Sequence, residues 1–328
     1  MSLPLVSVLI PARNEADDIE ECLAAVAGQD YPLDRLEVIV VDGNSSDATA
    51  AIARRTLDSA GFGSSVLLTN DEATTPSNLN LGLSQATGSI LCRVDARTRI
   101  ERHYVRTCVQ VLEERSDVAV VGGAQVASPR DSSARAVGIA RALNNRYSMG
   151  GSAYRRATVS RESDTVYLGA FRTAQLRELQ GWDPRFSTNQ DFDLNRRMAR
   201  LGTVWFDARL RSRYVPRATL GGLWRQYERF GRAKVRYWRL TRSRPQARQW
   251  ILLLMPVVLL PLGIGAFNRS PRLTVGVGFA GMLVGEIQGT SDPHGSFAAR
   301  VVALVAMAVV ATAWTIGVWR EILKVDNS

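Results

Sequence analysis

Two aspartates follow apolar segments of this sequence at places where their carboxylates could bind a ligand. Asp42 comes directly after the apolar run 36–41, and Asp95 comes shortly after the apolar run 88–92. The carboxyl ends of strands in an open α/β sheet form the edge at which such sheets bind ligands. Asp42 could accept hydrogen bonds from a nucleobase or ribose, and Asp95 could hold Mg²⁺ or Mn²⁺ on a diphosphate. These positions indicate a rim that binds a phosphorylated ligand.

The residues around Asp95 leave the form of this binding open. A second acid two positions later would complete an Asp-x-Asp metal clamp, but Arg97 stands there. Arg93 and Arg97 could contact phosphate directly, because guanidinium groups match phosphate oxygens. Alternatively, Asp95 only caps the turn that begins near Thr98, as Asp47 could cap the helix after the second strand.

A third acidic position, Asp191, lies at the expected N-terminus of a helix over residues 189–201. It could act as a general base that takes a proton from an acceptor hydroxyl. In the alternative interpretation, Asp191 and Asp193 are acids that the helix dipole favours in a first turn. Spacing alone does not decide between the two.

The elements that must position these residues alternate between strand and helix. Continuous apolar runs are typical of buried parallel strands, and the intervening segments have helical spacing of apolar residues. We therefore expect an α/β fold with a mostly parallel sheet. The expected strands are 5–10, 36–41, 66–69, 90–94, 118–121, 165–171, 204–206 and 211–215; the expected helices are 15–28, 48–57, 76–86, 101–114, 134–144 and 189–201; and 150–163 is expected to be a mobile loop.

Charge and cysteine content narrow the class of partner. The net charge is +10, but residues 1–130 carry −7 and residues 131–250 carry +16. This basic block precedes apolar segments, which favours an anionic membrane surface over nucleic acid. The three cysteines show no CxxC spacing, which argues against a zinc or disulfide framework and for a reducing compartment. The short apolar run 5–10 is followed at once by Pro and Arg, unlike a secretory signal.

The last third of the sequence predicts membrane association. Residues 220–240 form an Arg-rich amphipathic pattern typical of an interfacial helix, although an ordinary surface helix is the alternative. Of the apolar stretches 251–267, 273–287 and 298–319, only the last has the length of about 20 residues that a spanning helix needs. Soluble core helices are the alternative for these stretches.

The Arg-rich block predicts a cytoplasmic N-terminal domain at the inner (plasma) membrane. The expected domains are a catalytic domain 1–218, an interface helix 219–248 and a membrane region 249–328 with two to three spanning helices.

Taken in order, several motifs resemble a known family. The sequence is similar to inverting family 2 glycosyltransferases with the GT-A fold, in the membrane-anchored subgroup of succinoglycan-type exopolysaccharide glucosyltransferases. The resemblance covers about residues 5–250 and rests on the order and spacing of the motifs. These are VSVLIPARNEADDIEECL, VIVVDGNSSDATAAIA, NLNLGLSQATGSILCRVDAR, DTVYLGAFR, GWDPRFSTNQDFDLNRRMARLG and RQYERFGRAK.

The resemblance implies a role for each matching position. Asp42 would contact the base, Asp95 would hold the metal and diphosphate, and Asp191 would be the catalytic base. Gln226, Arg229 and Phe230 resemble the Gln-x-x-Arg-Trp signature near the acceptor. The residues expected to line the base pocket are Pro11, Ala12, Asn14 and Glu15, and the candidate donor-binding set also includes Asn80, Arg93 and Arg97.

Three positions depart from the family pattern. Arg97 replaces the second acid of Asp-x-Asp, Gln190 replaces the Glu of a Glu-Asp pair, and Phe230 replaces Trp. Arg97 leaves metal dependence open. If Asp191 is the base, loss of the neighbouring Glu carboxylate should lessen the like-charge elevation of the pKa of Asp191.

The expected activity is inverting transfer of a sugar from a nucleotide-diphosphate sugar, with a UDP-sugar favoured. The expected acceptor is a hydroxyl of a polyprenyl-linked saccharide or another lipid acceptor in cell-surface polysaccharide or glycolipid synthesis. Two alternatives remain open at this point. One is transfer directly onto polyprenyl phosphate, and the other is a non-catalytic membrane-anchored subunit that binds a nucleotide-sugar.

Overall fold

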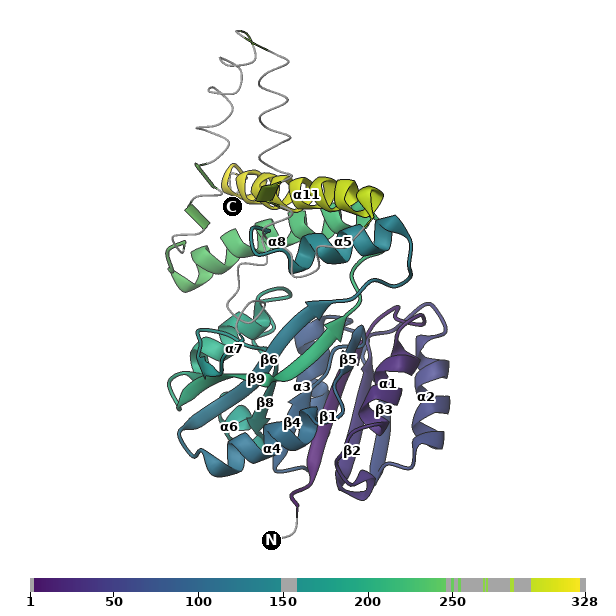
Figure 1. The fold of residues 1–328 in the computed structure, drawn as a ribbon. Helices are drawn as coiled ribbons and strands as arrows, with labels where there is room; N and C mark the ends of the chain where they lie inside the picture. Colours follow the sequence, from purple (N-terminus) through teal and green to yellow (C-terminus); the bar gives the residue numbers. More distant parts are fainter. Residues whose placement is uncertain are drawn as a thin grey trace. The chain divides into compact units, whose positions relative to one another are not determined.

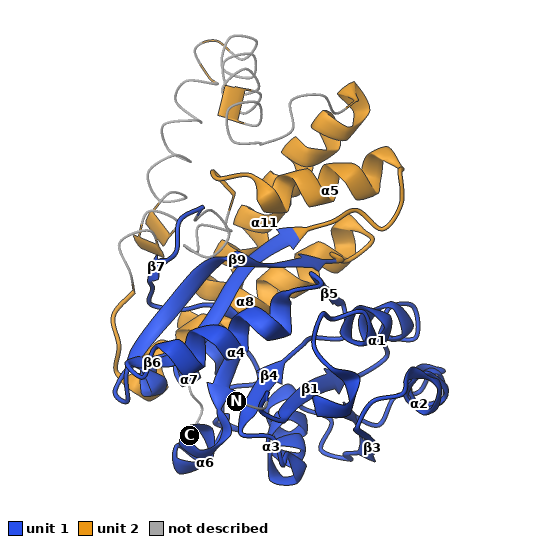
Figure 2. Cartoon of the chain, turned by 60° about the horizontal axis from the view of Figure 1, so that its bottom comes forward, with its two compact units in different colours: residues 1–126, 152–214 blue, residues 127–151, 215–328 orange. Residues whose placement is uncertain are grey.

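The computed structural model describes residues 3–148, 158–245, 249–250, 253–254, 268, 270, 284–285 and 296–324. The chain forms two units, one of residues 1–126 and 152–214 and the other of residues 127–151 and 215–328 (Figure 2). The second unit thus includes a segment from within the range 1–218 that the sequence assigns to the catalytic domain. Each unit is built around its own packed elements.

The first unit contains one mixed sheet with helices on both faces (Figure 1). Among the described residues the sheet has the strand order β3-β2-β1-β4-β8-β6-β9-β5, and β7 pairs with β9. Its elements are β1 (Val6–Ala12), α1 (Ile19–Ala27), β2 (Leu36–Asp42), α2 (Thr49–Ala60), β3 (Ser64–Thr69), α3 (Thr75–Gln85), β4 (Ile90–Arg93), β5 (Thr98–Ile100), α4 (Tyr104–Glu114), β6 (Val118–Ala127), β7 (Arg161–Glu162), β8 (Tyr167–Arg172), α6 (Thr173–Glu178), α7 (Gln190–Met198) and β9 (Thr203–Tyr214).

The expectation of a mostly parallel sheet was wrong for half of it. Strands β3, β2, β1 and β4 are parallel, as the strand–helix alternation predicts. Beyond β4, the sheet continues with β8, which runs antiparallel to both β4 and β6. The two short strands expected over 204–206 and 211–215 are a single strand, β9. Apolar runs identify strands, but direction follows from the sequence only while each strand is followed by a crossover helix.

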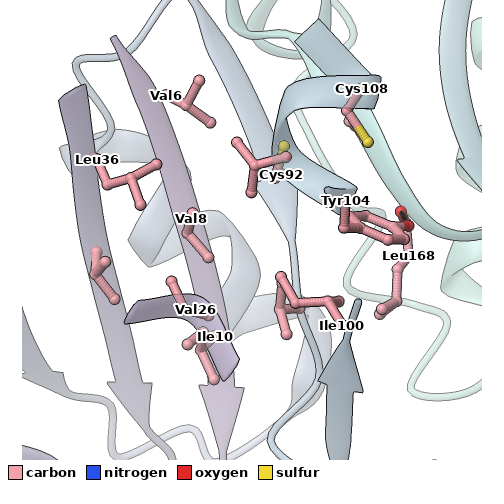
Figure 3. Close-up of a cluster of buried hydrophobic side chains, with 14 of the residues drawn as sticks. Val6, Val8, Ile10, Val26, Leu36, Cys92, Ile100, Tyr104, Cys108 and Leu168 are labelled. Atoms are coloured by element: carbon pink, nitrogen blue, oxygen red, sulfur yellow. Dashed lines mark hydrogen bonds between the residues drawn. The ribbon is translucent and has the colours of Figure 1, made fainter. Parts of the chain in front are cut away.

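Two apolar clusters show which helices cover each face. Alternate residues of a strand point to opposite faces, so Val6, Val8 and Ile10 of β1 join one cluster and Leu9 joins the other. Figure 3 shows the first cluster, in which β1 packs near side chains from α1 and α4. Cys92 and Cys108 lie in it as small buried side chains. The second cluster holds α3, α6 and α7, so both faces are covered and the strand ends remain available for a site.

The second unit packs three helices: α5 (Ala134–Asn144), α8 (Leu220–Thr241) and α11 (Phe297–Ile322). Glycines allow α8 and α11 to approach closely, because a Cβ on Gly231 would lie 2.2 Å from the Trp314 carbonyl oxygen. Two ion pairs also join these helices, Arg236 Nε–Glu321 Oε1 at 2.6 Å and Arg320 Nη1–Glu228 Oε1 at 2.5 Å. Part of the arginine charge of the predicted interfacial helix therefore serves contacts within the unit.

The expected apolar span 298–319 falls within α11. Among the described residues, this is the helix whose length and composition would allow it to cross a membrane. In the most apolar 18-residue segment of α11, 50% is buried inside the structure. The stretches 251–267 and 273–287 lie almost entirely outside the described residues. The structure therefore shows one candidate span, and the number of spanning helices stays a prediction.

The close approach of α8 and α11 gives a stability prediction. Gly231→Val is expected to lower the free energy of unfolding by about 1–3 kcal/mol, because added atoms would force apart backbones already in contact. Gly221→Ala is the control on the same helix, since a Cβ there has its nearest neighbour at 3.7 Å. Thermal unfolding in detergent should show a lower Tm for Gly231→Val only. Equal Tm values would contradict this packing.

Candidate functional site

The base pocket expected from the sequence maps to the carboxyl ends of two adjacent parallel strands. Pro11 and Ala12 end β1, and Ala12 lies in register with Asp42 at the end of β2. Asp42 is 3% exposed, and it accepts hydrogen bonds from the Ser45 N–H at 2.9 Å and the Ser45 hydroxyl at 2.5 Å. The carboxylate is thereby fixed in orientation at the rim.

The loops after these strands bind each other through Asn14. Its N–H donates to Ser45 Oγ at 2.9 Å, and its side-chain oxygen accepts from the Ser46 N–H at 2.9 Å. Asn14 has φ of 52°, a left-handed conformation that Asn tolerates better than most residues. Asp47 accepts from the Thr49 N–H at 3.0 Å, which supports the helix-start interpretation of Asp47. These contacts make the two loops one pre-formed wall.

Arg97 points its charge at this wall. Its Nε lies 2.6 Å from Glu15 Oε2, and both side chains are mostly buried. The sequence predicted Arg97 as a phosphate contact or a substitute for metal charge. The pair with Glu15 places the guanidinium against another member of the predicted base pocket. A role for either residue in donor binding stays a prediction.

The Glu15–Arg97 pair predicts a stability effect. Arg97→Met is expected to lower the free energy of unfolding by about 1–3 kcal/mol, because the mostly buried Glu15 carboxylate would lose the guanidinium that lies 2.6 Å from it. Arg55→Met, which breaks an exposed pair with Glu20, should change it by less than about 1 kcal/mol. Chemical denaturation of both variants provides the measurement. A smaller effect at Arg97 than at Arg55 would contradict the pairing.

The strongest feature of the rim is a three-residue ion cluster. Arg93, the last residue of β4, donates from Nε to Asp95 Oδ1 at 2.8 Å, and its Nη1 pairs with Asp191 Oδ1. Asp191 lies 98 residues later, in the first turn of α7. The structure therefore brings together the two acids that the sequence assigned to the diphosphate and to proton transfer. Asp95 Oδ2 has no hydrogen-bond partner among the described residues, whereas the Trp182 indole lies close to the Asp191 carboxyl.

The surroundings of Asp191 contain donors that sequence reasoning missed. Desolvation raises the pKa of Asp191, while the Arg93 guanidinium lowers it and offsets part of the rise. The buried Trp182 indole also lies close enough to Asp191 to lower its pKa, although within the described part of the chain its Nε1–H meets no hydrogen-bond geometry. The side-chain Nδ2 of Asn189 is likewise buried and unbonded. In the sequence, only the closeness of Asn189 to Asp191 pointed to it.

Asn80 contacts the protein rather than facing free space. Its Nδ2 donates to the Trp182 carbonyl oxygen at 2.6 Å, and its Oδ1 accepts from the Trp182 N–H at 2.8 Å. Both ends of the amide are thus used to hold the peptide of Trp182, next to the positive-φ residue Gly181. Asn80 was predicted to bind the donor. The structure shows it positioning the segment that leads to Asp191.

Comparison with known proteins identifies the family. Residues 7–166 match the family model described as Glycosyl transferase family 2, and residues 90–316 match Glycosyl transferase family group 2. Succinoglycan biosynthesis protein ExoA of Rhizobium meliloti (strain 1021) is 30% identical, with 96% of this chain and 94% of that protein covered. The chain belongs to glycosyl transferase family 2. The sequence-based assignment to this family is confirmed, and the similarity to succinoglycan biosynthesis protein ExoA is consistent with the expected exopolysaccharide subgroup.

Other relatives extend the comparison for this glycosyltransferase. A Methanococcus voltae enzyme is 26% identical over 70% of this chain and 72% of its own. It is named for glucuronosyl transfer to dolichyl N-acetyl-α-D-glucosaminyl phosphate. A Pyrobaculum calidifontis mannosyltransferase, solved with GDP-Man and Mn²⁺, has a TM-score of 0.62 at 20% identity, covering 100% of this chain and 89% of that one. That likeness confirms the glycosyltransferase fold.

The described residues of this glycosyltransferase offer few ligands for a metal ion. They contain no group of three His, Cys, Asp or Glu side chains that would hold one. Asp95 nevertheless fits a metal that takes most of its ligands from a diphosphate and water, because its Oδ2 is free and its side chain is 31% exposed. One carboxylate is enough for such a site.

The acceptor-side signature of the glycosyltransferase lies on α8. Gln226, Arg229 and Phe230 belong to the second unit, and the Phe230 ring contacts the Tyr227 ring with centroids 5.4 Å apart. Arg229 is exposed. Their proposed role toward the acceptor stays a prediction.

Proposed function

We propose that this glycosyltransferase moves a sugar from a nucleotide-diphosphate sugar to a hydroxyl of a polyprenyl-linked saccharide, with inversion at the anomeric carbon. The observation that carries the proposal is the cluster in which Arg93 joins Asp95 and Asp191. It brings the carboxylate that we assign to the donor diphosphate next to the carboxylate that we assign to the acceptor hydroxyl. The relatives named for exopolysaccharide synthesis and for dolichyl-linked transfer support the acceptor class.

The chemistry follows from these groups. Asp191 Oδ2 takes the proton of the acceptor hydroxyl, whose oxygen attacks the anomeric carbon. The bond from that carbon to the diphosphate oxygen breaks on the opposite face, so the configuration inverts. Asp95 would hold Mg²⁺ or Mn²⁺, which supplies positive charge to the leaving diphosphate when bound. Asp42 and the loop around Asn14 bind the nucleoside.

The membrane part of the proposal rests on the second unit. We place the enzyme at the cytoplasmic face of the inner membrane, with α11 or the apolar stretches before it as the anchor. An acceptor on a polyprenyl carrier would explain apolar segments that follow directly on an Arg-rich helix. A soluble sugar acceptor would require neither the apolar segments nor the Arg-rich helix.

The test begins with the purified full chain in detergent. Nucleotide-sugars are screened for thermal stabilisation with Mn²⁺ and with EDTA, and the best donor is then supplied with a polyprenyl-linked saccharide or with polyprenyl phosphate. Release of nucleoside diphosphate only with the saccharide supports the proposal. Release only with polyprenyl phosphate favours direct transfer to the lipid phosphate. Stabilisation without release from any acceptor would favour the non-catalytic alternative.

A further inference from the structure

Arg93 is a buried cation placed between two functional carboxylates. Its side chain is 6% exposed, although it belongs to the rim of the sheet. Arg93 uses Nε for Asp95 and Nη1 for Asp191, so two of its three nitrogens are already committed within the protein. A guanidinium group in this state has little capacity left for a diphosphate. This contrasts with the phosphate-binding role that the sequence predicts for it.

The geometry gives Arg93 a different task at Asp191. Asp191 lies in the first turn of a nine-residue helix, and its side chain is 43% exposed, so local packing alone leaves its rotamer weakly fixed. The planar fork of an arginine constrains a carboxylate more than a point charge would. Arg93 contacts Oδ1 of both acids, so its guanidinium does not occupy the second oxygen of either carboxylate. It also fixes how far apart the two carboxylates lie.

We propose that Arg93 is a positioning residue that acts through Asp191, orienting the carboxylate for the acceptor hydroxyl and tying it to the donor-side Asp95. This inference rests on the proposed function, because it takes Asp191 as the base. It differs from a diphosphate contact, whose removal would weaken donor binding. It also differs from a purely structural ion cluster, whose removal would lower stability without a selective effect on turnover.

Arg99 provides a matched control in the same unit. Its Nη2 lies 2.9 Å from Asp18 Oδ1 and 2.7 Å from Glu21 Oε2, so it too joins two acids from a mostly buried position. Arg99 contacts neither Asp95 nor Asp191. Arg93→Met and Arg99→Met should therefore lower Tm to a similar extent, and only the first should impair turnover.

The first measurement separates turnover from binding. Arg93→Met is expected to lower kcat about 100-fold, as small misplacements of reacting groups do. The Kd for UDP or GDP with Mn²⁺, measured by calorimetry, should stay within about threefold of wild type, because a positioning residue makes no contact with the diphosphate. Arg93→Lys should recover about tenfold of the lost rate, because it restores the charge without the fork. A tenfold weaker nucleotide Kd with unchanged kcat would instead make Arg93 a diphosphate ligand.

The second measurement is a double-mutant comparison. If Arg93 acts through Asp191, Arg93→Met should slow the Asp191→Asn enzyme by less than about threefold, because residues that act as a unit are not additive. If Arg93→Met lowered the rate about 100-fold in both the wild-type and the Asp191→Asn enzyme, the positioning role of Arg93 would be overturned, but the proposed function would not. A wild-type rate for Asp191→Asn would overturn the proposed function as well. If Arg93→Met fails to fold, the Arg93→Lys enzyme provides the test. A wild-type kcat for Arg93→Lys would then contradict the proposal.

Discussion

Replacing Asp191 by Asn is expected to lower sugar transfer by about 10²–10⁴-fold, the usual contribution of a general base. An amide has nearly the same shape but cannot take the proton of the acceptor hydroxyl. The variant should have a lower Tm, because the buried Arg93 loses one of its two charged partners, and it should bind UDP or GDP with Mn²⁺ as wild type does. Nucleoside diphosphate release at saturating donor and acceptor gives the rate, and calorimetry gives the nucleotide Kd.

Asp193→Asn is the control for this variant on the same helix. Asp193 pairs with Arg197 at 2.8 Å and is not part of the ion cluster. We expect Asp193→Asn to lower Tm with little effect on kcat per folded enzyme. An Asp191→Asn enzyme that transfers at the wild-type rate would contradict the assignment of the base. It would instead favour an acceptor that is already an anionic phosphate.

The pH dependence of transfer should report the same group. Although the Asp191 side chain is 43% exposed, desolvation of its carboxyl by the surrounding protein raises its pKa above the ordinary value for aspartate, with Arg93 offsetting part of the rise. The base acts as a carboxylate, so kcat should fall as the pH is lowered through this raised pKa. The acidic limb should be absent from the residual activity of Asp191→Asn. An identical limb in both enzymes would assign it to another group.

The sequence predicted the residues of the rim better than their partners. Asp42 and Asp95 were expected at strand ends, and they lie at the end of β2 and just after β4, because apolar runs reveal where buried strands stop. Asp191 was expected in the first turn of a helix, where it lies in α7. These predictions needed only local patterns along the chain.

The ion cluster could not be predicted in the same way. Contact between Arg93 and Asp191 spans 98 residues, and β4 pairs antiparallel with β8, a direction that the strand–helix alternation did not predict. The pairing of Arg97 with Glu15 could not be predicted either. A motif determines where a residue lies on the rim, but not the direction in which its long flexible side chain extends. The hydrogen bonds from Asn80 to Trp182 join residues 102 positions apart for the same reason.

Asp95→Asn is expected to lower kcat/KM by about 10²–10³-fold, similar to the loss of one group that stabilises transition-state charge. Unlike Asp191→Asn, it should also weaken nucleotide binding and remove the difference between Mn²⁺ and EDTA, because Asp95 Oδ2 is the free oxygen that fits a metal. Thermal shifts with UDP or GDP, in Mn²⁺ and in EDTA, measure this separately from turnover.

Asp207→Asn is the control for loss of a buried carboxylate. Asp207 pairs with Arg209 at 2.9 Å and contacts none of the three residues of the ion cluster. The Asp207→Asn variant should have a lower Tm while the effect of Mn²⁺ stays intact.

If Asp95→Asn kept the full stabilisation by Mn²⁺ and nucleotide, metal binding would not depend on Asp95, and protein cations would have to balance the charge of the diphosphate. Because Arg93 is committed to two carboxylates and Arg97 to Glu15, neither is free to replace the metal without breaking an ion pair. Metal dependence of the donor site therefore stays a prediction, which the comparison of Mn²⁺ with EDTA decides.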